Sequence, residues 1–303
     1  MIPSIDLNQN KSDSLLQACS EWGFFLLRGH HIERPLIDAV LAQSQRFFSQ
    51  PEKYKQPFSR TAENPWGYYA DELTKNRKDW KQIFDIGPDT PADAYITPWP
   101  ELEEFRDTMR SYFSAAHSLA MDLVDALATS LDDNANVRNA FTDHSSFLRL
   151  NYYPTCEVPA PADSGWVPPY GELGISHHTD AGALTVLLQD QIAGLQVYRA
   201  GRWHTVRPAV DQLVINVGDI VQVWSNDTIR APLHRVLANR THSRLSAAYF
   251  LNPAYAYDYA PLPACSQPEP RYRAINWGEF RSQRTAGDYA DVGAEVQISN
   301  YRR

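Results

Sequence analysis

Cysteine is scarce in this chain of 303 residues, and its three copies, Cys19, Cys156 and Cys265, are widely separated. An odd number without a C-x-x-C pair argues against both a disulfide framework and a thiolate zinc site. Basic residues are in the minority, since 28 Lys and Arg stand against 36 Asp and Glu, and the formal net charge is −8. A general nucleic-acid-binding protein needs a basic face. We therefore expect no nucleic-acid partner, although a small basic pocket for an anionic ligand remains compatible with this charge.

Long apolar runs are also missing. No stretch approaches the roughly 20 residues that a membrane-spanning helix needs, while 43% hydrophobic and 21% charged residues are ordinary for a globular protein. The first residues, MIPSIDLNQNKSD, contain no basic segment followed by an apolar one, so no secretory signal is expected. We expect a cytoplasmic monomer that binds no membrane.

Helical spacing dominates the first half of the chain. Apolar residues recur at intervals of three and four over residues 101–130, which predicts a long helix, and residues 32–48 show a shorter version of the same pattern. A further helix fits residues 14–22, and the apolar run 23–27 is typical of a buried strand. Residues 57–100 are rich in Pro, Gly and aromatic residues, and we expect them to be irregular.

Short strands separated by turn residues are predicted for the second half. Eight such segments favour a jelly roll or a barrel. They are residues 147–153, 184–188, 194–198, 202–206, 213–217, 220–224, 234–237 and 247–251. Between the first two lies the proline-rich segment 156–172, which is interpreted as a surface loop. No flexible linker separates the helical half from the strand half, so one folded unit is expected.

One histidine and one carboxylate form an H-x-D pair, His178-Thr179-Asp180. Residues i and i+2 of a strand share a face, so both groups would converge on one point, whereas His177 would point away. His234, at the start of another predicted strand, supplies a third ligand. Two histidines and one carboxylate form the facial triad of non-haem Fe(II) oxygenases, which leaves positions open for other ligands. An isolated H-x-D pair is weak evidence, because a solvated or capping pair gives the same pattern.

Five further polar residues are predicted to face the same site. Arg244 and Ser246 alternate on one strand, and a guanidinium offers a bidentate fork for a carboxylate. Arg149, Asn151 and Tyr153 alternate on another strand. Polar groups on an inward face would be costly in a dry core, so this face is expected to line a polar pocket. A surface arginine at 244 and an ordinary core tyrosine at 153 are the alternatives.

Together with the H-x-D pair, the distal histidine and the R-x-S pair, most of the chain resembles the isopenicillin N synthase-like family of Fe(II)/2-oxoglutarate-dependent dioxygenases. The resemblance is carried by an ordered set of segments rather than by any one of them. The segments are IPSIDL, ACSEWGFFLLRGHHI, FFSQPEKYK, NPWGYY, DWKQIFDIG, RLNYYPTC, HHTDAGALTVLLQD, GLQV, LVINVGDIVQVWSND, HRV and RLS. Two departures are a longer segment 156–176 and Arg28-Gly29-His30-His31 in place of the usual Asn-His-Gly.

The resemblance implies a mainly β fold, a double-stranded β-helix (jelly-roll) core with flanking α-helices from the N-terminal half. It implies four regions: an N-terminal dioxygenase region over residues 1–115 that forms a mixed α/β support layer, a helical connection over 116–143, the jelly-roll core over 144–255, and a C-terminal extension over 256–303 packed on the core.

The resemblance also implies the chemistry. Fe(II) would be held by His178, Asp180 and His234. The distal carboxylate of the cosubstrate 2-oxoglutarate would be held by Arg244, Ser246 and Tyr153, with Asn151 beside them. With O2, the enzyme would hydroxylate, desaturate or cyclise a small organic metabolite, while 2-oxoglutarate is decarboxylated to succinate and CO2. Ascorbate would support the reaction in vitro.

Two alternatives stay open. The first is a 2-oxoglutarate-independent Fe(II) oxidase of the same family, like isopenicillin N synthase or 1-aminocyclopropane-1-carboxylate oxidase, since an R-x-S pair can bind another carboxylate. The second is a non-catalytic jelly-roll binding module, which would leave Arg244 and Tyr153 without a task.

The pocket for the organic substrate is predicted from residues that flank these strands. The candidates are Arg149, Tyr69, Phe84, Ile86, Leu195, Phe250 and Asn252. Core packing is the alternative for Phe84 and Leu195, and pairing with Asp or Glu is the alternative for Arg149.

The segment 156–176 starts beside Tyr153 and ends near His178, so it is a candidate lid over the substrate entrance, anchored by Trp166 or Tyr170. The alternative is that it packs on the outside of the β core.

Overall fold

Two sheets and a layer of helices make up the fold of the computed structural model, which describes residues 1–9, 12–89, 95–132, 136–291 and 293–303. The larger sheet has eight strands in the order β1-β2-β12-β9-β14-β7-β6-β3, and the smaller has four in the order β11-β10-β13-β8. This pair of sheets is the jelly-roll core that the sequence predicts.

The strands of the larger sheet come from both halves of the chain. They are β1 (Ser4–Asp6), β2 (Phe24–Arg28), β3 (Gly67–Tyr69), β6 (Gln82–Ile86), β7 (Phe147–Tyr153), β9 (Leu184–Gln189), β12 (Leu213–Val217) and β14 (Arg244–Leu251). Apart from the parallel pair β1 and β2, neighbours in this sheet run antiparallel. β14 therefore lies between β9 and β7, where its residues are paired on both sides.

The strands of the smaller sheet are β8 (Leu173–His178), β10 (Leu195–Arg199), β11 (Arg202–Thr205) and β13 (His234–Leu237). Two short ribbons complete the strands, β4 (Leu73–Thr74) with β5 (Arg77–Lys78), and β15 (Asp258–Tyr259) with β16 (Ile275–Asn276). Apolar residues of both sheets, among them Tyr153, Leu195, Val214 and Val236, form a core between them.

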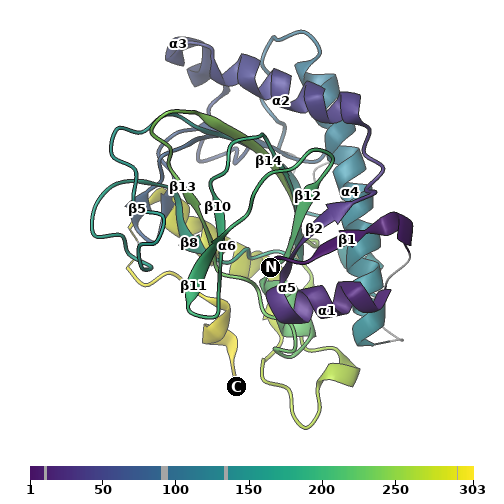
Figure 1. Cartoon of the computed structure of the whole chain (residues 1–303). Coiled ribbons are helices and arrows are strands. Elements are labelled where there is room, and N and C mark those ends of the chain that lie inside the picture. The colour runs from purple at the N-terminus through teal and green to yellow at the C-terminus, as the bar shows by residue number, and fades with distance from the viewer. Residues whose placement is uncertain (10–11, 90–94, 133–135, 292) are drawn as a thin grey trace.

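Helices α1 (Ser12–Trp22), α2 (Arg34–Phe48) and α4 (Phe105–Leu131) pack on the face of the larger sheet that points away from the smaller one (Figure 1). The other helices are α3 (Glu52–Lys55), α5 (Asp219–Trp224) and α6 (Trp277–Tyr289), with short 3-10 turns at Leu7–Gln9, Gln56–Phe58, Arg138–Phe141, Pro263–Cys265 and Ile298–Tyr301. Within the described ranges no helix is long and apolar enough to cross a membrane.

The packing of α2 and α4 on this face follows from their apolar stripes. Phe47 of α2 and Phe105 of α4 contact Phe84 of β6, with ring centroids 4.8 and 5.8 Å apart. Each such fully buried side chain contributes about 1.5–3 kcal/mol. The sheet is thereby held rigid from its outer side, which leaves its inner face free to carry polar groups.

Three predictions about local structure are wrong. Residues 220–224 form the helix α5 and not a strand, because a short apolar run that is buried on all sides carries no periodicity. Residues 57–100 are not irregular throughout, since they contain β3 and β6, which extend the larger sheet beside β7. The segment 156–176, expected to be a loop, ends in the strand β8.

Candidate active site

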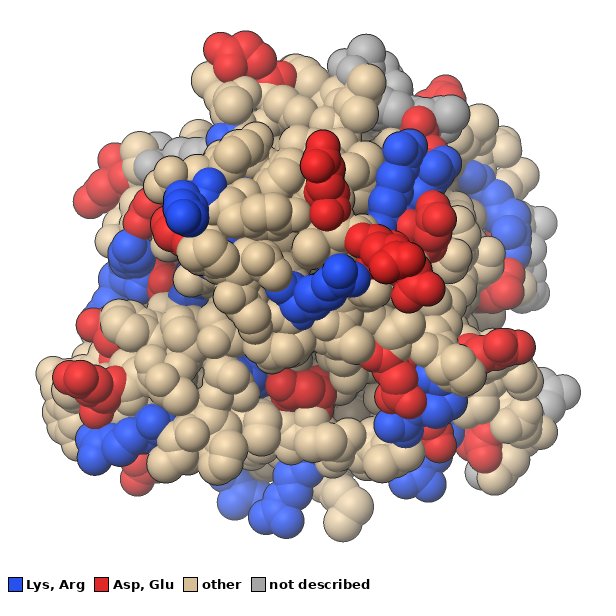
Figure 2. Space-filling model, turned by 90° about the horizontal axis from the view of Figure 1, so that it is seen from above, with Lys and Arg blue, Asp and Glu red and all other residues tan. Residues whose placement is uncertain are grey.

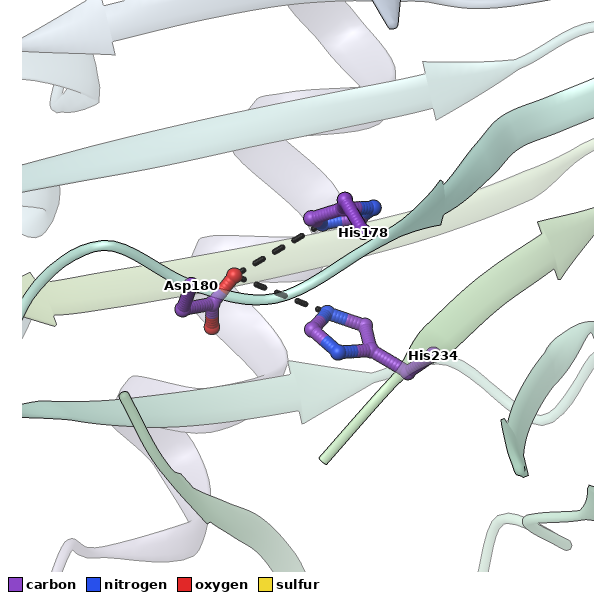
Figure 3. A group of neighbouring side chains, drawn as sticks. All are labelled: His178, Asp180 and His234. Carbon is purple, nitrogen blue, oxygen red and sulfur yellow. Dashed lines mark ion pairs between the residues drawn. The ribbon is translucent and has the colours of Figure 1, made fainter. Parts of the chain in front are cut away.

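Two histidines from neighbouring strands and one aspartate from the following loop meet at the rim between the sheets. His178 ends β8 and His234 begins β13, and the two residues are direct partners in the antiparallel register. Asp180 Oδ1 lies 3.6 Å from His178 Nε2 and 3.5 Å from His234 Nε2. Figure 3 shows the three side chains pointing toward one another. Their ligand atoms all lie within 4.8 Å of each other, which is the arrangement that a metal ion requires.

The hydrogen bonds of the two imidazoles decide which nitrogen is available. His178 Nδ1 lies 2.9 Å from the Ser176 carbonyl oxygen, and His234 Nδ1 lies 3.0 Å from the Pro232 carbonyl oxygen. A carbonyl only accepts, so each Nδ1 carries the proton and each Nε2 keeps its lone pair. Both lone pairs therefore face Asp180 and are free to bind a metal.

Asp180 is oriented in the same way. Its Oδ2 accepts hydrogen bonds from Thr185 Oγ1 at 2.5 Å and from Asn216 Nδ2 at 2.8 Å, which leaves Oδ1 for the metal. Burial raises the pKa of Asp180, but the neighbouring imidazoles and these donors outweigh it and lower the pKa below its usual value. Burial, with His234 beside it, lowers the pKa of His178 to about 3. A neutral imidazole and an ionised carboxylate are the protonation states that metal binding needs. The donor set fits Fe(II).

The inner face of β14 lines one cavity with this triad. Every second residue from 244 to 252 contributes to the lining, as strand alternation requires: Arg244, Ser246, Ala248, Phe250 and Asn252. On the paired strand β7, Arg149, Asn151 and Tyr153 do the same. The cavity has a volume of about 160 Å³. The structure thus brings the predicted iron ligands and the predicted 2-oxoglutarate contacts to one place.

Arg244 is a buried cation in this cavity. Its Nη2 donates to Gln189 Oε1 at 2.9 Å and its Nε to the Ile192 carbonyl at 3.2 Å, while its guanidinium lies 4.9 Å from the centre of the Tyr153 ring. All these partners are neutral, and in the described part of the chain no carboxylate forms an ion pair with Arg244. Asp190 acts on Arg244 only through its charge, without a direct ion pair. A buried cation that lacks a direct anionic partner is costly, so the site is suited to an anionic ligand. The buried Asn151 Oδ1 nearby also has no hydrogen-bond partner among the described residues.

Arg149 is bound by acidic neighbours. It donates two hydrogen bonds of 2.7 Å to Asp85 and one of 3.0 Å to Glu72. Glu72 also lies 2.6 Å from Lys81 Nζ. Burial raises the pKa of Glu72, but the surrounding cations outweigh it and hold that pKa well below its usual range. Of the two interpretations offered by the sequence, pairing with acidic residues is the one the structure shows, although Arg149 still lines the cavity.

Three candidates for the substrate pocket do not line the cavity. In the register of β6 and β7, Ile83 pairs with Asn151 and Asp85 with Arg149, so Phe84 and Ile86 lie on the opposite face. Both are fully buried under the helices. Tyr69 lies at the edge of the sheet with the Arg60 guanidinium 4.0 Å from the centre of its ring. The prediction for Phe84 and Ile86 is wrong because their immediate neighbours, and not they, share the face of Asn151 and Arg149. The candidates Leu195, Phe250 and Asn252 do line the cavity.

Helix α6 forms a wall that the sequence interpretation missed. Trp277, Arg281, Arg284 and Asp288 all line the cavity, and their spacing of four, three and four puts them on one helical face. In the sequence, Asn276 followed three residues later by Glu279 is typical of a helix start, and Asn276 Oδ1 does accept a hydrogen bond from Glu279 N at 3.1 Å. That signal predicts the helix but not that this face meets the cavity. Arg284 donates at 2.9 Å to the carbonyl of Thr179, the residue between two of the triad members.

The proline-rich loop packs on the outer face of the smaller sheet. Arg235, which follows His234 and points the other way, donates to Ala162 O at 2.9 Å, Gly165 O at 3.0 Å and Ser164 Oγ at 3.1 Å. Trp166 contacts the outward-facing His177, with ring centroids 5.7 Å apart.

Trp166 is 52% exposed, Tyr170 is 62% exposed, and neither lines the cavity. Of the two arrangements the sequence allows for this loop, the structure favours packing on the outside of the β core over a lid.

Comparison with known proteins decides the family. Residues 144–253 match the 2OG-Fe(II) oxygenase superfamily, and residues 2–103 match the N-terminal domain of the non-haem dioxygenases in morphine synthesis. This chain belongs to the 2OG-Fe(II) oxygenase superfamily. It is 32% identical to gibberellin 2-beta-dioxygenase 6 of Oryza sativa subsp. japonica over 95% of this chain and 78% of that protein. It is 30% identical to codeine O-demethylase of Papaver somniferum over 85% and 70% of the two chains.

Solved structures of this superfamily agree. A full-length protein of Neurospora crassa, crystallised in complex with alpha-KG and thymine, superposes with a TM-score of 0.80 at 28% identity, over 94% of this chain and 96% of that one. JOX2 in complex with 2OG, Fe and JA gives a TM-score of 0.83 at 27% identity, over 99% and 88%. The predictions of a jelly-roll fold, of an Fe(II)- and 2-oxoglutarate-dependent dioxygenase acting on a small organic metabolite, and of these cofactors are confirmed.

Proposed function

We propose that His178, Asp180 and His234 bind the iron of this oxygenase, and that Arg244 binds the distal carboxylate of 2-oxoglutarate with Ser246 and Tyr153, with Asn151 beside them. When bound, Fe(II) with 2-oxoglutarate supplies the activation of O2 for the oxidation. The protein's own groups orient the reactants. The carbonyls of Ser176 and Pro232 fix both imidazoles, and Thr185 and Asn216 fix the carboxylate.

The observation that carries this proposal is the buried Arg244, which lines the same cavity as the triad and forms no direct ion pair with a carboxylate among the described residues, although the charge of Asp190 acts on it from a longer distance. 2-Oxoglutarate is a dicarboxylate that fits both requirements of the cavity. Its keto-acid end would bind the metal, and its other carboxylate would pair with the Arg244 guanidinium. The alternative of a 2-oxoglutarate-independent oxidase would leave that guanidinium for a carboxylate of the organic substrate.

Calorimetric titration of 2-oxoglutarate into Mn(II)-loaded protein tests the proposal without turnover. Binding at one site per chain that requires the metal is expected. With Fe(II) and O2, the protein should also release succinate. Absence of both binding and succinate would contradict the assignment of this cavity to 2-oxoglutarate.

We further propose that the enzyme hydroxylates, desaturates or cyclises its substrate as a cytoplasmic monomer, independent of nucleic acid and membranes. The net charge of −8 supports the lack of a nucleic-acid partner. On the face shown in Figure 2, basic and acidic side chains are interspersed, without the continuous basic surface that binding a polyanion needs. Size-exclusion chromatography with light scattering tests the oligomeric state, and a dimer mass would contradict this part.

A further inference from the structure

We propose that Arg281 of α6 binds a carboxylate of the organic substrate, so that this enzyme oxidises a monocarboxylic acid with an apolar body. The inference rests on the proposed function, because it assumes that iron binds at the triad and that 2-oxoglutarate binds at Arg244. It adds the chemical class of the substrate and the residue that selects it.

Among the described residues, four guanidinium groups line the cavity, and three of them are engaged. Arg149 is held by Asp85 and Glu72. Arg284 donates to two backbone carbonyls. Arg244 has three neutral partners and is assigned to 2-oxoglutarate. The side chain of Arg281 makes no hydrogen bond or ion pair with any residue that the structure describes, and its guanidinium lies 5.5 Å from the centre of the Phe147 ring. Its donors therefore remain available to a ligand.

The position of Arg281 fits a role in binding. It lies on the cavity-facing side of α6, one turn from Arg284, which contacts the backbone between His178 and Asp180. A ligand held by Arg281 would therefore lie beside the metal end of the cavity. A guanidinium forms two parallel hydrogen bonds with a carboxylate, which fixes the ligand's orientation as well as its charge.

Two aromatic rings lie on the side of Arg281 away from its acidic neighbours. Phe147, whose ring the Arg281 guanidinium contacts, stacks on Phe250 with ring centroids 4.7 Å apart and an interplanar angle of 22°. Leu195, Leu187 and Ile175 line the same cavity farther in, where they pack with Tyr153. The two rings cannot donate or accept ordinary hydrogen bonds, so they fit a hydrocarbon or aromatic body with few polar groups, held at one end by the arginine.

Acidic neighbours limit the charge of the ligand. Asp288 lines the cavity two helical turns after Arg281, and Glu72 lines it as well. Burial and the charge of Glu72 raise the pKa of Asp288 to about 6, although Arg281 and Arg149 act in the opposite direction. With two carboxyl groups already in the lining, a dianion such as a phosphate monoester fits this end less well than a monoanion does. A single carboxylate can be bound by Arg281 alone.

Matched pairs of ligands test this subsite. The probes are phenylacetic, cinnamic, 1-naphthoic and decanoic acids, each compared with its methyl ester, which keeps the body and removes the charge. The measurement is the rise in melting temperature of the protein already loaded with Mn(II) and 2-oxoglutarate, since a bound ligand stabilises the folded state. We expect at least one of the acids to raise the melting temperature of the parent more than its ester does.

Three variants complete the experiment. Arg281→Gln should abolish the preference for acids, with a loss of acid affinity of about tenfold or more. Arg281→Lys should retain part of it. The control Arg240→Gln removes an exposed positive charge that does not line the cavity and should behave as the parent. Equal shifts by acids and esters in the parent, including no shift by either, would overturn the inference, as would an unchanged preference in Arg281→Gln.

The shift caused by 2-oxoglutarate is measured first in every variant. If that shift is missing in the parent, the proposed function fails. If it is present but acids are not preferred, only the inference about Arg281 fails. A normal shift in Arg281→Gln also shows that this variant is folded.

Discussion

The strand wall of the cavity, formed by β7, β8, β13 and β14, differs from its helix wall, formed by α6, in how each holds its charged groups. On the strand wall, each imidazole of the triad is held by a backbone carbonyl and Asp180 by two side chains. On the helix wall, Arg284 has two carbonyl partners, but the side chains of Arg281 and Asp288 form no hydrogen bond or ion pair among the described residues and interact with each other only through their charges. Fixed groups suit chemistry that is the same in every turnover, and unengaged groups suit recognition of a particular substrate.

Arg244 gives the largest expected effect on ligand binding. Arg244→Ala should weaken 2-oxoglutarate binding by about 30-fold or more, because truncating one partner of a buried ion pair costs about 2–5 kcal/mol. Tyr153→Phe should cost only about 0.5–1.5 kcal/mol, since it removes one hydrogen bond. Calorimetry on the Mn(II)-loaded protein measures both. Parent-like affinity in both variants would show that the strand wall does not hold the cosubstrate.

Arg284 connects the two walls. Arg284→Gln removes the bonds to the Thr179 and Val296 carbonyls, so the backbone between His178 and Asp180 loses a restraint. We expect Mn(II) affinity to fall about tenfold, in the range for residues that orient metal ligands. Arg281→Gln, on the same helical face, is the matched control and should leave metal affinity unchanged. If both variants lost affinity alike, α6 would act on the metal site only through its general packing.

Asp288 should make stability depend on pH. Its pKa is raised from 3.8 to about 6, first by burial and then by Glu72. Ionised Asp288 therefore destabilises the folded protein at neutral pH. As pH falls, the folded protein takes up a proton at about pH 6 and the unfolded chain only near pH 4, so the destabilisation disappears between these two values. Asp288→Asn cannot ionise and should melt at a higher temperature than the parent at about pH 8, with little difference near pH 4. An equal difference at both pH values would contradict the assignment.

The outer loop gives the smallest expected effect. Trp166→Ala removes a half-exposed side chain that contacts His177 and Tyr198, so we expect a loss of about 1 kcal/mol or less in stability. The Michaelis constants for 2-oxoglutarate and for the organic substrate should not change. A selective rise in the constant for the organic substrate would restore the lid that the sequence suggested.

The same contrast explains what the sequence could predict. Strand alternation correctly assigned Arg244 and Ser246 to the cavity face and separated His178 from His177, because a period of two fixes the face once a single residue is placed. Asp180 reaches the site as predicted, but from the loop after β8 and not from a strand. Alternation failed for Phe84 and Ile86, where the strand β6 itself was not recognised and the register was therefore unknown.

The helix wall was out of reach for another reason. α6 lies after the proline-rich stretch in a polar segment, so its stripe of Trp277, Arg281, Arg284 and Asp288 has no apolar periodicity. Only the fold shows that this face meets the cavity. The pairing of Arg149 with Asp85 and Glu72 likewise joins residues 64 and 77 positions apart, and such distant contacts are not encoded by local spacing.

The most direct test of the account compares two adjacent histidines. His178 points into the triad and His177 contacts Trp166 on the outer face, so alternation alone separates their roles. The measurement is Fe(II)-dependent succinate release from 2-oxoglutarate by His178→Ala and His177→Ala, with Mn(II) affinity measured on the same samples. The account predicts that His178→Ala loses metal binding and succinate release while His177→Ala keeps both. Retained activity in His178→Ala, or its loss in His177→Ala alone, would contradict it.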